Sequence, residues 1–239
     1  MAIATKYIEY TDNNSILEGY FAFDDTQQQP RPTVLIAHAW EGRDEFVCEK
    51  AHKLAELGYN GFALDVYGQG VFGNNPEENG RLMQPFLDDR VMLQRRLTAG
   101  LQAALELPQV SANEVAVMGY CFGGLCALDL ARTGANLKGA VSFHGLLHPP
   151  GNTDGNTILA KVLVLHGDKD PLATIDQVVA LREELSKADA DWQIHFYGSA
   201  EHSFTNPQAN SPETGLVYNA GADARSWRLL LQFLDEIFI

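Results

Sequence analysis

The chain has 239 residues, of which 46% are hydrophobic and 20% charged, a composition that suits one large α/β domain spanning residues 1–239. The formal net charge of -14 argues against nucleic acid or an anionic membrane as a partner, because both repel a strongly acidic protein. The three cysteines form no CxxC pair, and no apolar stretch approaches the roughly 20 residues that a membrane span needs.

The first half of the chain predicts an edge hairpin followed by alternating strands and helices. Two strand-like stretches, 5–10 and 16–23, are separated by the turn-prone Asp12-Asn13-Asn14. The next expected elements are a buried strand at 33–38, a helix at 44–57 ended by Gly58, a strand at 61–66, a loop at 68–80 that could wall a pocket, and a long amphipathic helix at 81–105.

The second half of the chain continues the alternation. Its expected elements are strands at 114–118, 139–143, 161–166 and 192–197, and helices at 122–133, 175–187 and 222–238. This order predicts an α/β fold with a mostly parallel twisted sheet, helices on both faces and an antiparallel N-terminal edge hairpin. In such a sheet, ligands bind beyond the carboxyl ends of the strands.

A hydrophobic strand is joined to a helix by the segment Val117-Met-Gly-Tyr-Cys-Phe-Gly-Gly124. Its Gly-x-Cys-x-Gly pattern is that of a nucleophile elbow with cysteine in the place of serine. Glycine is needed at both positions for a steric reason, because side chains two residues before and after the nucleophile would collide on this strained turn. The helix N-terminus favours a thiolate, so the pattern predicts Cys121 as a nucleophile.

The same pattern requires an acid and then a histidine, each after a strand and in that chain order. Leu163-Val-Leu-His-Gly-Asp-Lys-Asp170 places Asp170 after one buried strand, with Asp168 as a rival acid two positions earlier. Ile194-His-Phe-Tyr-Gly-Ser-Ala-Glu-His202 places His202 after the next strand. The three matches together predict a triad of Cys121, Asp170 and His202.

The predicted roles follow from charge. His202 would take the thiol proton of Cys121, while Asp170 would fix the imidazole tautomer and stabilise the imidazolium. The thiolate then attacks a carbonyl carbon, and water hydrolyses the thioester intermediate. Two backbone N–H groups, those of Phe122 and of Trp40 on the loop after strand 33–38, are expected to hold the oxyanion. No metal or cofactor is expected.

Three segments carry a resemblance to a known family: Gly119-Tyr-Cys-Phe-Gly-Gly124, His166-Gly-Asp-Lys-Asp170 and Glu201-His-Ser-Phe204. They resemble the matching segments of the dienelactone hydrolases (carboxymethylenebutenolidases), a cysteine branch of the α/β-hydrolases. The resemblance runs over nearly the whole chain. It implies an α/β-hydrolase fold, the same triad, and hydrolysis of a small ester or lactone.

Two features depart from the family's pattern. The family has a glutamate that pairs with the resting thiol; here Ala39 matches that position, and the nearest carboxylate is Glu41. The family's two arginines that hold the substrate carboxylate have no counterpart, since one would fall near Gly68-Gln69 and the other falls at Asn206. A neutral or differently charged ester is therefore expected rather than dienelactone itself.

Several other side chains follow predicted strands. Glu41, Tyr120 and His144 are candidates for the substrate pocket, although core packing explains Tyr120 and His144 about equally well. His38 and His166 lie in or at the end of buried strands and are expected to be core residues.

Two other functions stay open from the sequence: a thioesterase or acyl-transfer enzyme, and a catalytically idle scaffold that binds a small molecule or a protein. The N-terminus lacks the basic start and apolar core of a signal peptide, and an odd number of cysteines disfavours a disulfide framework, so a cytoplasmic location is expected. The expected partner is a small-molecule ester or lactone substrate, and the chain is expected to be a monomer or a small homo-oligomer.

Overall fold

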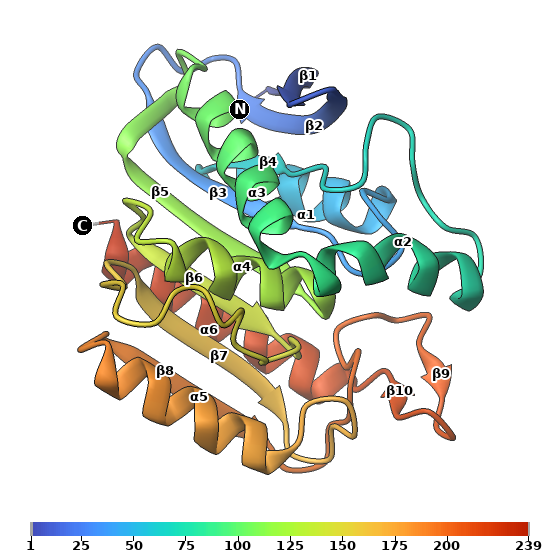
Figure 1. The fold of residues 1–239 in the computed structure, drawn as a ribbon. Coiled ribbons are helices and arrows are strands. Elements are labelled where there is room, and N and C mark those ends of the chain that lie inside the picture. Colours follow the sequence, from blue (N-terminus) through green and yellow to red (C-terminus); the bar gives the residue numbers. More distant parts are fainter. Residues whose placement is uncertain (1, 239) are drawn as a thin grey trace. The chain divides into compact units, whose positions relative to one another are not determined.

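Strands and helices alternate along the chain in the computed structural model, which describes residues 2–238 (Figure 1). The residues fall into two units, Met1–Met118 and Gly119–Ile239. The expectation of a single domain over 1–239 stays a prediction. The two units are described in turn.

The first unit begins with an antiparallel hairpin, as the sequence predicts, which turns at Asn13 with φ 52°. Its strands lie in the order β1-β2-β4-β3, with β2 and β4 antiparallel and β3 and β4 parallel. Their bounds are β1 (Ile3–Asp12), β2 (Ser15–Asp24), β3 (Arg31–Ala37) and β4 (Asn60–Ala63), and the helices are α1 (Glu45–Glu56), α2 (Pro76–Asp88) and α3 (Arg90–Leu105).

Helices cover both faces of β4 in the first unit. A Cβ at Gly61 would lie 2.3 Å from the Ala51 carbonyl oxygen of α1, so this glycine allows α1 to approach the strand closely. A Cβ at Gly100 of α3 would lie 2.5 Å from the Leu64 side chain. Residues 61 and 64 have opposite parity along the chain and face opposite sides, so α1 and α3 pack on different faces.

The second unit carries parallel strands and helices of its own. β5 (Val110–Tyr120) runs from the first unit into the second, and β6, β7 and β8 then lie in this order and pair in parallel. The remaining bounds are α4 (Phe122–Arg132), β6 (Gly139–Phe143), β7 (Lys161–Gly167), α5 (Ile175–Lys187), β8 (Trp192–Tyr197), β9 (Asn210–Ser211), β10 (Leu216–Val217) and α6 (Ala220–Ile237).

Opposite faces of β6 receive different helices. A Cβ at Gly139 would meet Phe233 and Ile237 of α6, whereas Ser142, of opposite parity, lies against Gly124 of α4. The apolar run of β7 that the sequence marks as a buried strand is indeed buried from Val162 to Gly167. The predicted combination of parallel strands, covering helices and an antiparallel N-terminal hairpin is confirmed.

The prediction of one helix over 81–105 is wrong, because α2 and α3 are separate helices that meet at Asp89. Asp89 has a non-helical φ of -120° and ψ of 85°, and its side chain accepts the Met92 N–H at 2.8 Å, so it caps α3. Pro85 lacks the N–H that would bond one turn back within α2. The start of α2 is signalled by Asn75-Pro76, a capping residue followed by proline.

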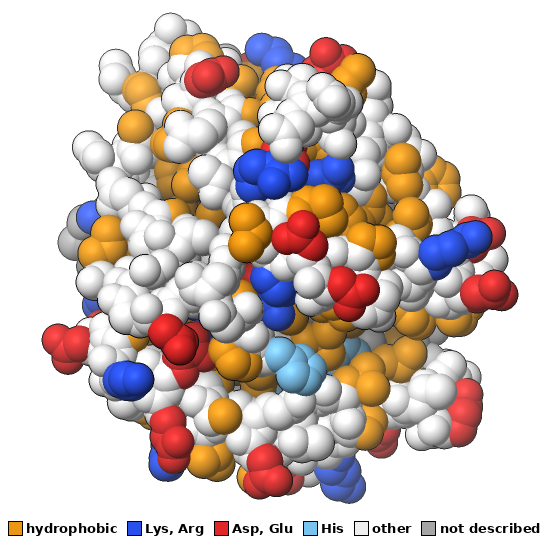
Figure 2. Space-filling view, in the orientation of Figure 1, with side chains coloured by type: hydrophobic (Ala, Val, Ile, Leu, Met, Phe, Trp, Pro, Cys, Tyr) orange, Lys and Arg blue, Asp and Glu red, His pale blue; other side chains and the backbone are white. Residues whose placement is uncertain are grey.

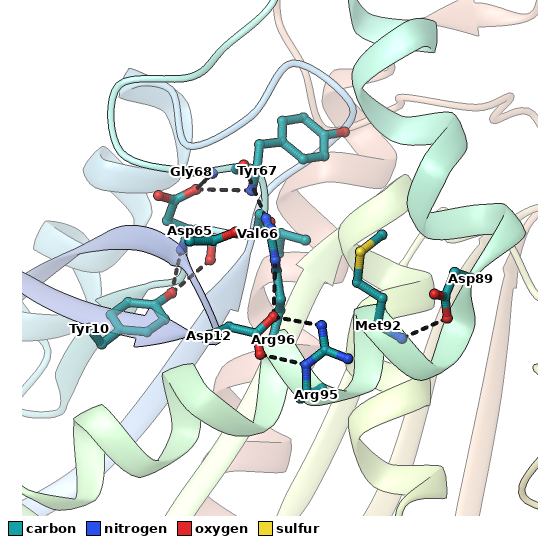
Figure 3. A network of polar contacts seen from close by, with 11 residues as sticks. Tyr10, Asp12, Asp65, Val66, Tyr67, Gly68, Asp89, Met92, Arg95 and Arg96 are labelled. Atoms are coloured by element: carbon teal, nitrogen blue, oxygen red, sulfur yellow. Dashed lines mark hydrogen bonds and ion pairs between the residues drawn. The ribbon is translucent and has the colours of Figure 1, made fainter.

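A buried polar network joins the hairpin, α3 and the loop after β4 in the first unit (Figure 3). The Arg96 guanidinium is 10% exposed and donates to Asp12 at 3.3 Å and to the Tyr67 carbonyl at 3.0 Å. The Tyr10 hydroxyl donates to the Asp65 carbonyl, and the Asp65 carboxylate accepts the Tyr67 N–H. The network satisfies buried polar groups that would otherwise oppose folding.

Acidic side chains are spread over the face shown in Figure 2, with basic side chains among them. This distribution agrees with the formal net charge of -14. Among residues 2–238, no helix has both the length and the apolar character that crossing a membrane requires.

Candidate active site

Cys121 occupies the turn between β5 and α4. Its φ of 54° and ψ of -116° lie outside the regions that a side-chain-bearing residue prefers. A Cβ at Gly119 would lie 2.0 Å from the Gly123 carbonyl oxygen, so the steric conflict that the sequence pattern predicts is present, and glycine relieves it. The turn is therefore the strained elbow expected from Gly-x-Cys-x-Gly.

Backbone hydrogen bonds hold this elbow in place. The Cys121 N–H donates to the Phe143 carbonyl at the end of β6, at 3.0 Å, and the Cys121 carbonyl accepts the N–H of Gly124 at 3.0 Å. A backbone of this kind costs on the order of 1–3 kcal/mol and persists only where its surroundings hold it. The side chain that it presents is a cysteine that forms no disulfide.

Asp170 and His202 form a buried hydrogen-bonded pair. His202 Nδ1 and Asp170 Oδ2 are 2.8 Å apart, and both side chains are fully buried. The other carboxylate oxygen, Oδ1, accepts the backbone N–H groups of Leu172 at 2.8 Å and Ala173 at 3.1 Å. The rival acid Asp168 is exposed, and the bond to His202 is made by Asp170.

The second ring nitrogen of His202, Nε2, is buried and has no hydrogen-bond partner among the described residues within bonding geometry. Burial lowers the pKa of His202, but the charge of Cys121, the hydrogen bond to Asp170 and the charge of Asp170 outweigh burial and raise the pKa to about 10. Cys121 is thus close enough for its charge to act on the imidazole. The arrangement offers a base, held by a carboxylate, beside a thiol.

A short hairpin that the sequence analysis missed supports the loop of His202. The Val217 N–H of β10 donates to the His202 carbonyl at 3.0 Å. A Cβ at Gly215, where φ is 73°, would lie 2.3 Å from Pro171, the neighbour of Asp170. Strands of two residues show no periodicity, so the turn glycine Gly215 is the only signal in the sequence for this hairpin.

Two pocket candidates and one expected core residue of the second unit are buried. His144 is 2% exposed and Tyr120 is 2% exposed, and the Tyr120 ring stacks on Phe143 with centroids 4.7 Å apart. His166, expected in the core, is 1% exposed and packs its ring against Phe196. A pocket role for Tyr120 and His144 stays a prediction.

Trp40 and Glu41 belong to the first unit, on the loop after β3. The Trp40 indole N–H donates to Glu41 Oε1 at 2.8 Å, and the Trp40 carbonyl accepts the Tyr67 hydroxyl at 3.1 Å. Burial raises the pKa of Glu41 above its usual value. His38 is fully buried and accepts the Val66 N–H, as expected for a core histidine. The site roles of Trp40 and Glu41 stay predictions.

Each unit also has a cavity of its own. One of about 660 Å³ in the first unit has Arg43, Cys48 and Tyr20 in its wall, and one of about 400 Å³ in the second has Arg132 and Glu184. Neither wall includes Cys121 or the Asp–His pair. No group of three or more His, Cys, Asp or Glu within residues 2–238 is arranged to hold a metal ion.

The alternation of strands and helices, with a strained elbow between β5 and α4, defines an α/β-hydrolase. A likeness in fold alone extends to an α/β hydrolase from a Medee basin deep-sea metagenome, at 20% identity over 98% of both chains with a TM-score of 0.69.

The model of the dienelactone hydrolase family matches residues 17–238, and the chain belongs to this family. A dienelactone hydrolase-like promiscuous phosphotriesterase from metagenomic libraries is 36% identical over the full length of both chains, with a TM-score of 0.94. A protein of Yersinia pestis assigned as a carboxymethylenebutenolidase is 26% identical, over 92% of this chain and 84% of its own. The chain is therefore a dienelactone hydrolase-like enzyme that acts on esters or lactones.

Proposed function

We propose that the enzyme hydrolyses small uncharged esters or lactones, with Cys121 as nucleophile, His202 as general base and Asp170 as the acid that orients the base. The observation that carries this proposal is the fully buried Asp170–His202 pair at 2.8 Å, in which the nearby charge of a cysteine on a strained elbow helps to raise the pKa of His202. A structural cysteine would have no need of either feature.

The proposed reaction has two halves. In the first, His202 Nε2 holds the proton taken from the Cys121 thiol, as the raised pKa of His202 favours; the sulfur bonds to the carbonyl carbon, and the protonated imidazole gives its proton to the departing alkoxide. In the second, His202 takes a proton from water, the hydroxide adds to the thioester carbon, and the C–S bond breaks to return the thiol. Asp170 keeps the ring proton on Nδ1 throughout, because its Oδ2 accepts that hydrogen bond.

The oxyanion formed in each half needs two hydrogen-bond donors. Phe122 is the first residue of α4, where the helix dipole favours negative charge, so its N–H is the proposed first donor. The Trp40 N–H is the proposed second donor, on the sequence argument alone.

The proposed substrates are uncharged because the positions of the family's substrate-binding arginines carry other residues. Gly68-Gln69 and Asn206 supply no positive charge, and the Asn206 Oδ1 already accepts the Gln208 N–H at 2.9 Å. An arginine can hold a carboxylate with two charged hydrogen bonds, which an amide does not replace. The binding of a neutral ester does not depend on these arginines.

Phosphotriesters are a second class of substrate, favoured by the 36% identity to a promiscuous phosphotriesterase over the whole of both chains. A phosphotriester is neutral and has a phosphoryl oxygen where an ester has a carbonyl oxygen. The same thiolate would bond to phosphorus and expel an aryloxide, and water would then cleave the S–P bond.

Turnover of p-nitrophenyl acetate, a neutral lactone, a carboxylate-bearing lactone, a thioester and a p-nitrophenyl dialkyl phosphate tests the proposal. Cys121→Ala should abolish turnover of the neutral ester while leaving the circular dichroism spectrum unchanged. Wild-type turnover in this variant would refute the cysteine mechanism. A preference for the thioester would favour a thioesterase instead, and a preference for the carboxylate-bearing lactone would refute the argument from the missing arginines.

Thiol labelling separates an enzyme from an idle scaffold. Iodoacetamide should alkylate Cys121 much faster than Cys48, because burial raises the pKa of Cys48, and faster than Cys126, which is fully buried. Three equally slow thiols would favour a scaffold. We also propose a cytoplasmic location, supported by three cysteines that form no disulfide.

A further inference from the structure

His144 is a strained and buried residue directly after β6. Its φ of 37° is a left-handed value that glycine adopts freely and histidine rarely does. Its N–H donates to the Leu165 carbonyl of β7 at 2.9 Å. The side chain is 2% exposed, so it has little surface to offer a substrate. A polar ring held in this way needs another explanation than lining the pocket.

The His144 ring is bonded to the loop that carries His202. His144 Nε2 and Thr205 Oγ1 are 2.8 Å apart, and the threonine is 1% exposed. The other nitrogen of His144, Nδ1, has no hydrogen-bond partner among the described residues. A buried acceptor without a partner is more tolerable than a buried N–H without one, which favours the tautomer that donates from Nε2 to Thr205. The bond ties this loop to the end of β6.

The same ring also packs directly on His202. The two imidazole centroids are 5.2 Å apart in an edge-to-face arrangement at 65°, and Phe204 packs on His144 at 5.0 Å. A single hydrogen bond to Asp170 leaves the His202 ring free to tilt about the line between Nδ1 and Oδ2. An aromatic edge against the ring opposes that tilt, and with it a change in the direction of Nε2.

His144 can pack here only as a neutral ring. Burial lowers the pKa of His144 well below its usual value, and the nearby His202 and His166 lower it further. Asp170 and Cys121 act on His202, and Asp170 and Asp168 act on His166. An imidazolium at His144 would oppose the positive charge that His202 acquires when it takes a proton.

We propose that His144 is a positioning residue for His202: its hydrogen bond to Thr205 and its ring contact fix the tilt of the base toward Cys121. The inference rests on the proposed cysteine mechanism and adds to it a residue that acts through His202. The signature of this role is a slower acylation step in molecules that are otherwise folded and active.

Two variants test the role and one serves as a matched control. Thr205→Val removes the hydroxyl at nearly constant volume, and His144→Phe keeps a ring but loses the hydrogen bond. The control Thr33→Val removes a buried hydroxyl of the first unit, which accepts from the Asn60 amide at 3.1 Å. Stopped-flow bursts with p-nitrophenyl acetate give the acylation rate constant and the active fraction. Iodoacetamide labelling gives the pH of half-maximal alkylation of Cys121.

The expected result is that Thr205→Val and His144→Phe lower the acylation rate constant about 10- to 100-fold. The pH of half-maximal alkylation of Cys121 should move upward in both, since a tilted His202 supports the thiolate less well. Thr33→Val should change neither quantity. Should His144→Phe fail to fold, Thr205→Val decides alone.

The inference is overturned if Thr205→Val matches Thr33→Val, or if it loses burst amplitude and thermal stability while the acylation rate constant stays at the wild-type value. Failure of the proposed function looks different. Cys121→Ala would then turn over ester at the wild-type rate, whatever the two positioning variants do.

Discussion

Asp170→Asn tests the buried acid–base pair most directly. In the wild type, Asp170 Oδ1 accepts the N–H groups of Leu172 and Ala173, while Oδ2 accepts from His202 Nδ1 at 2.8 Å. An asparagine must keep its carbonyl oxygen on the two backbone N–H groups, because its NH₂ group cannot accept hydrogen bonds. The NH₂ group then points at His202 Nδ1, which becomes an acceptor, and the ring proton moves to Nε2.

The expected loss of activity in Asp170→Asn follows from this change of tautomer. With its proton on Nε2, His202 cannot take the proton of Cys121, so kcat/KM for p-nitrophenyl acetate should fall about 10³- to 10⁴-fold, or about 4 to 5.5 kcal/mol in the activation barrier. Both backbone hydrogen bonds and the side-chain volume are retained. The variant should therefore stay folded, as thermal unfolding followed by circular dichroism would show.

Asp168→Asn provides the matched control, since it makes the same chemical change two residues earlier on an exposed side chain. Its kcat/KM should stay within about twofold of the wild type, as is usual for surface substitutions. The reasoning is refuted if Asp170→Asn retains more than a tenth of wild-type activity, or if Asp168→Asn is equally damaging.

Three further predictions concern stability. Cys121→Gly should be about 1 kcal/mol more stable than Cys121→Ala by urea unfolding, because only glycine is unstrained at φ 54°, and equal midpoints would contradict the strain. The pKa of His202 is raised to about 10 in the folded protein, although burial lowers it. Protonated His202 therefore stabilises the folded state fully below pH 6.5, and this stabilisation is lost as the pH rises through 10. The unfolding free energy should fall over that window in the wild type and less in Cys121→Ala; parallel curves would exclude the coupling. Arg96→Met should cost about 3 kcal/mol and Arg95→Met less than about 1 kcal/mol, since their side chains are 10% and 45% exposed, and similar losses would count against the buried network.

The elements that could be predicted from the sequence are those whose signal is local. The apolar runs of β3 and β7 and the spacing of α5 each specify an element within a few residues, and α5 has the expected bounds, Ile175–Lys187. The elbow at Cys121 is local as well, because both glycines that permit it lie within two residues of the cysteine. Because strands alternate with helices along the chain, the loops after the next strands could also be identified, and these loops carry the acid and then the histidine.

What the sequence could not predict depends on contacts between distant segments or on short elements. Asp89 divides a continuous helical pattern because its side chain caps the second helix better than it continues the first. The bond between His144 and Thr205 joins residues 61 positions apart and has no counterpart in local periodicity. The local pattern alone left both Asp170 and Asp168 as candidates; the family resemblance favoured Asp170, which is the buried one of the two.

Two residues of the second unit with positive φ, Cys121 and His144, each directly follow one of two successive strands. Cys121, after β5, donates its N–H to the end of β6, and His144, after β6, donates its N–H to Leu165 of β7. Glycine would remove a strain of about 1–3 kcal/mol at each position. A side chain at either position therefore lowers stability, and its presence is explained only by a role that glycine cannot fill. The Cys121 side chain supplies the sulfur, and the His144 side chain supplies a ring that packs against His202. The strain at both strand ends is therefore explained by a single requirement, which is to hold the base in position beside the nucleophile.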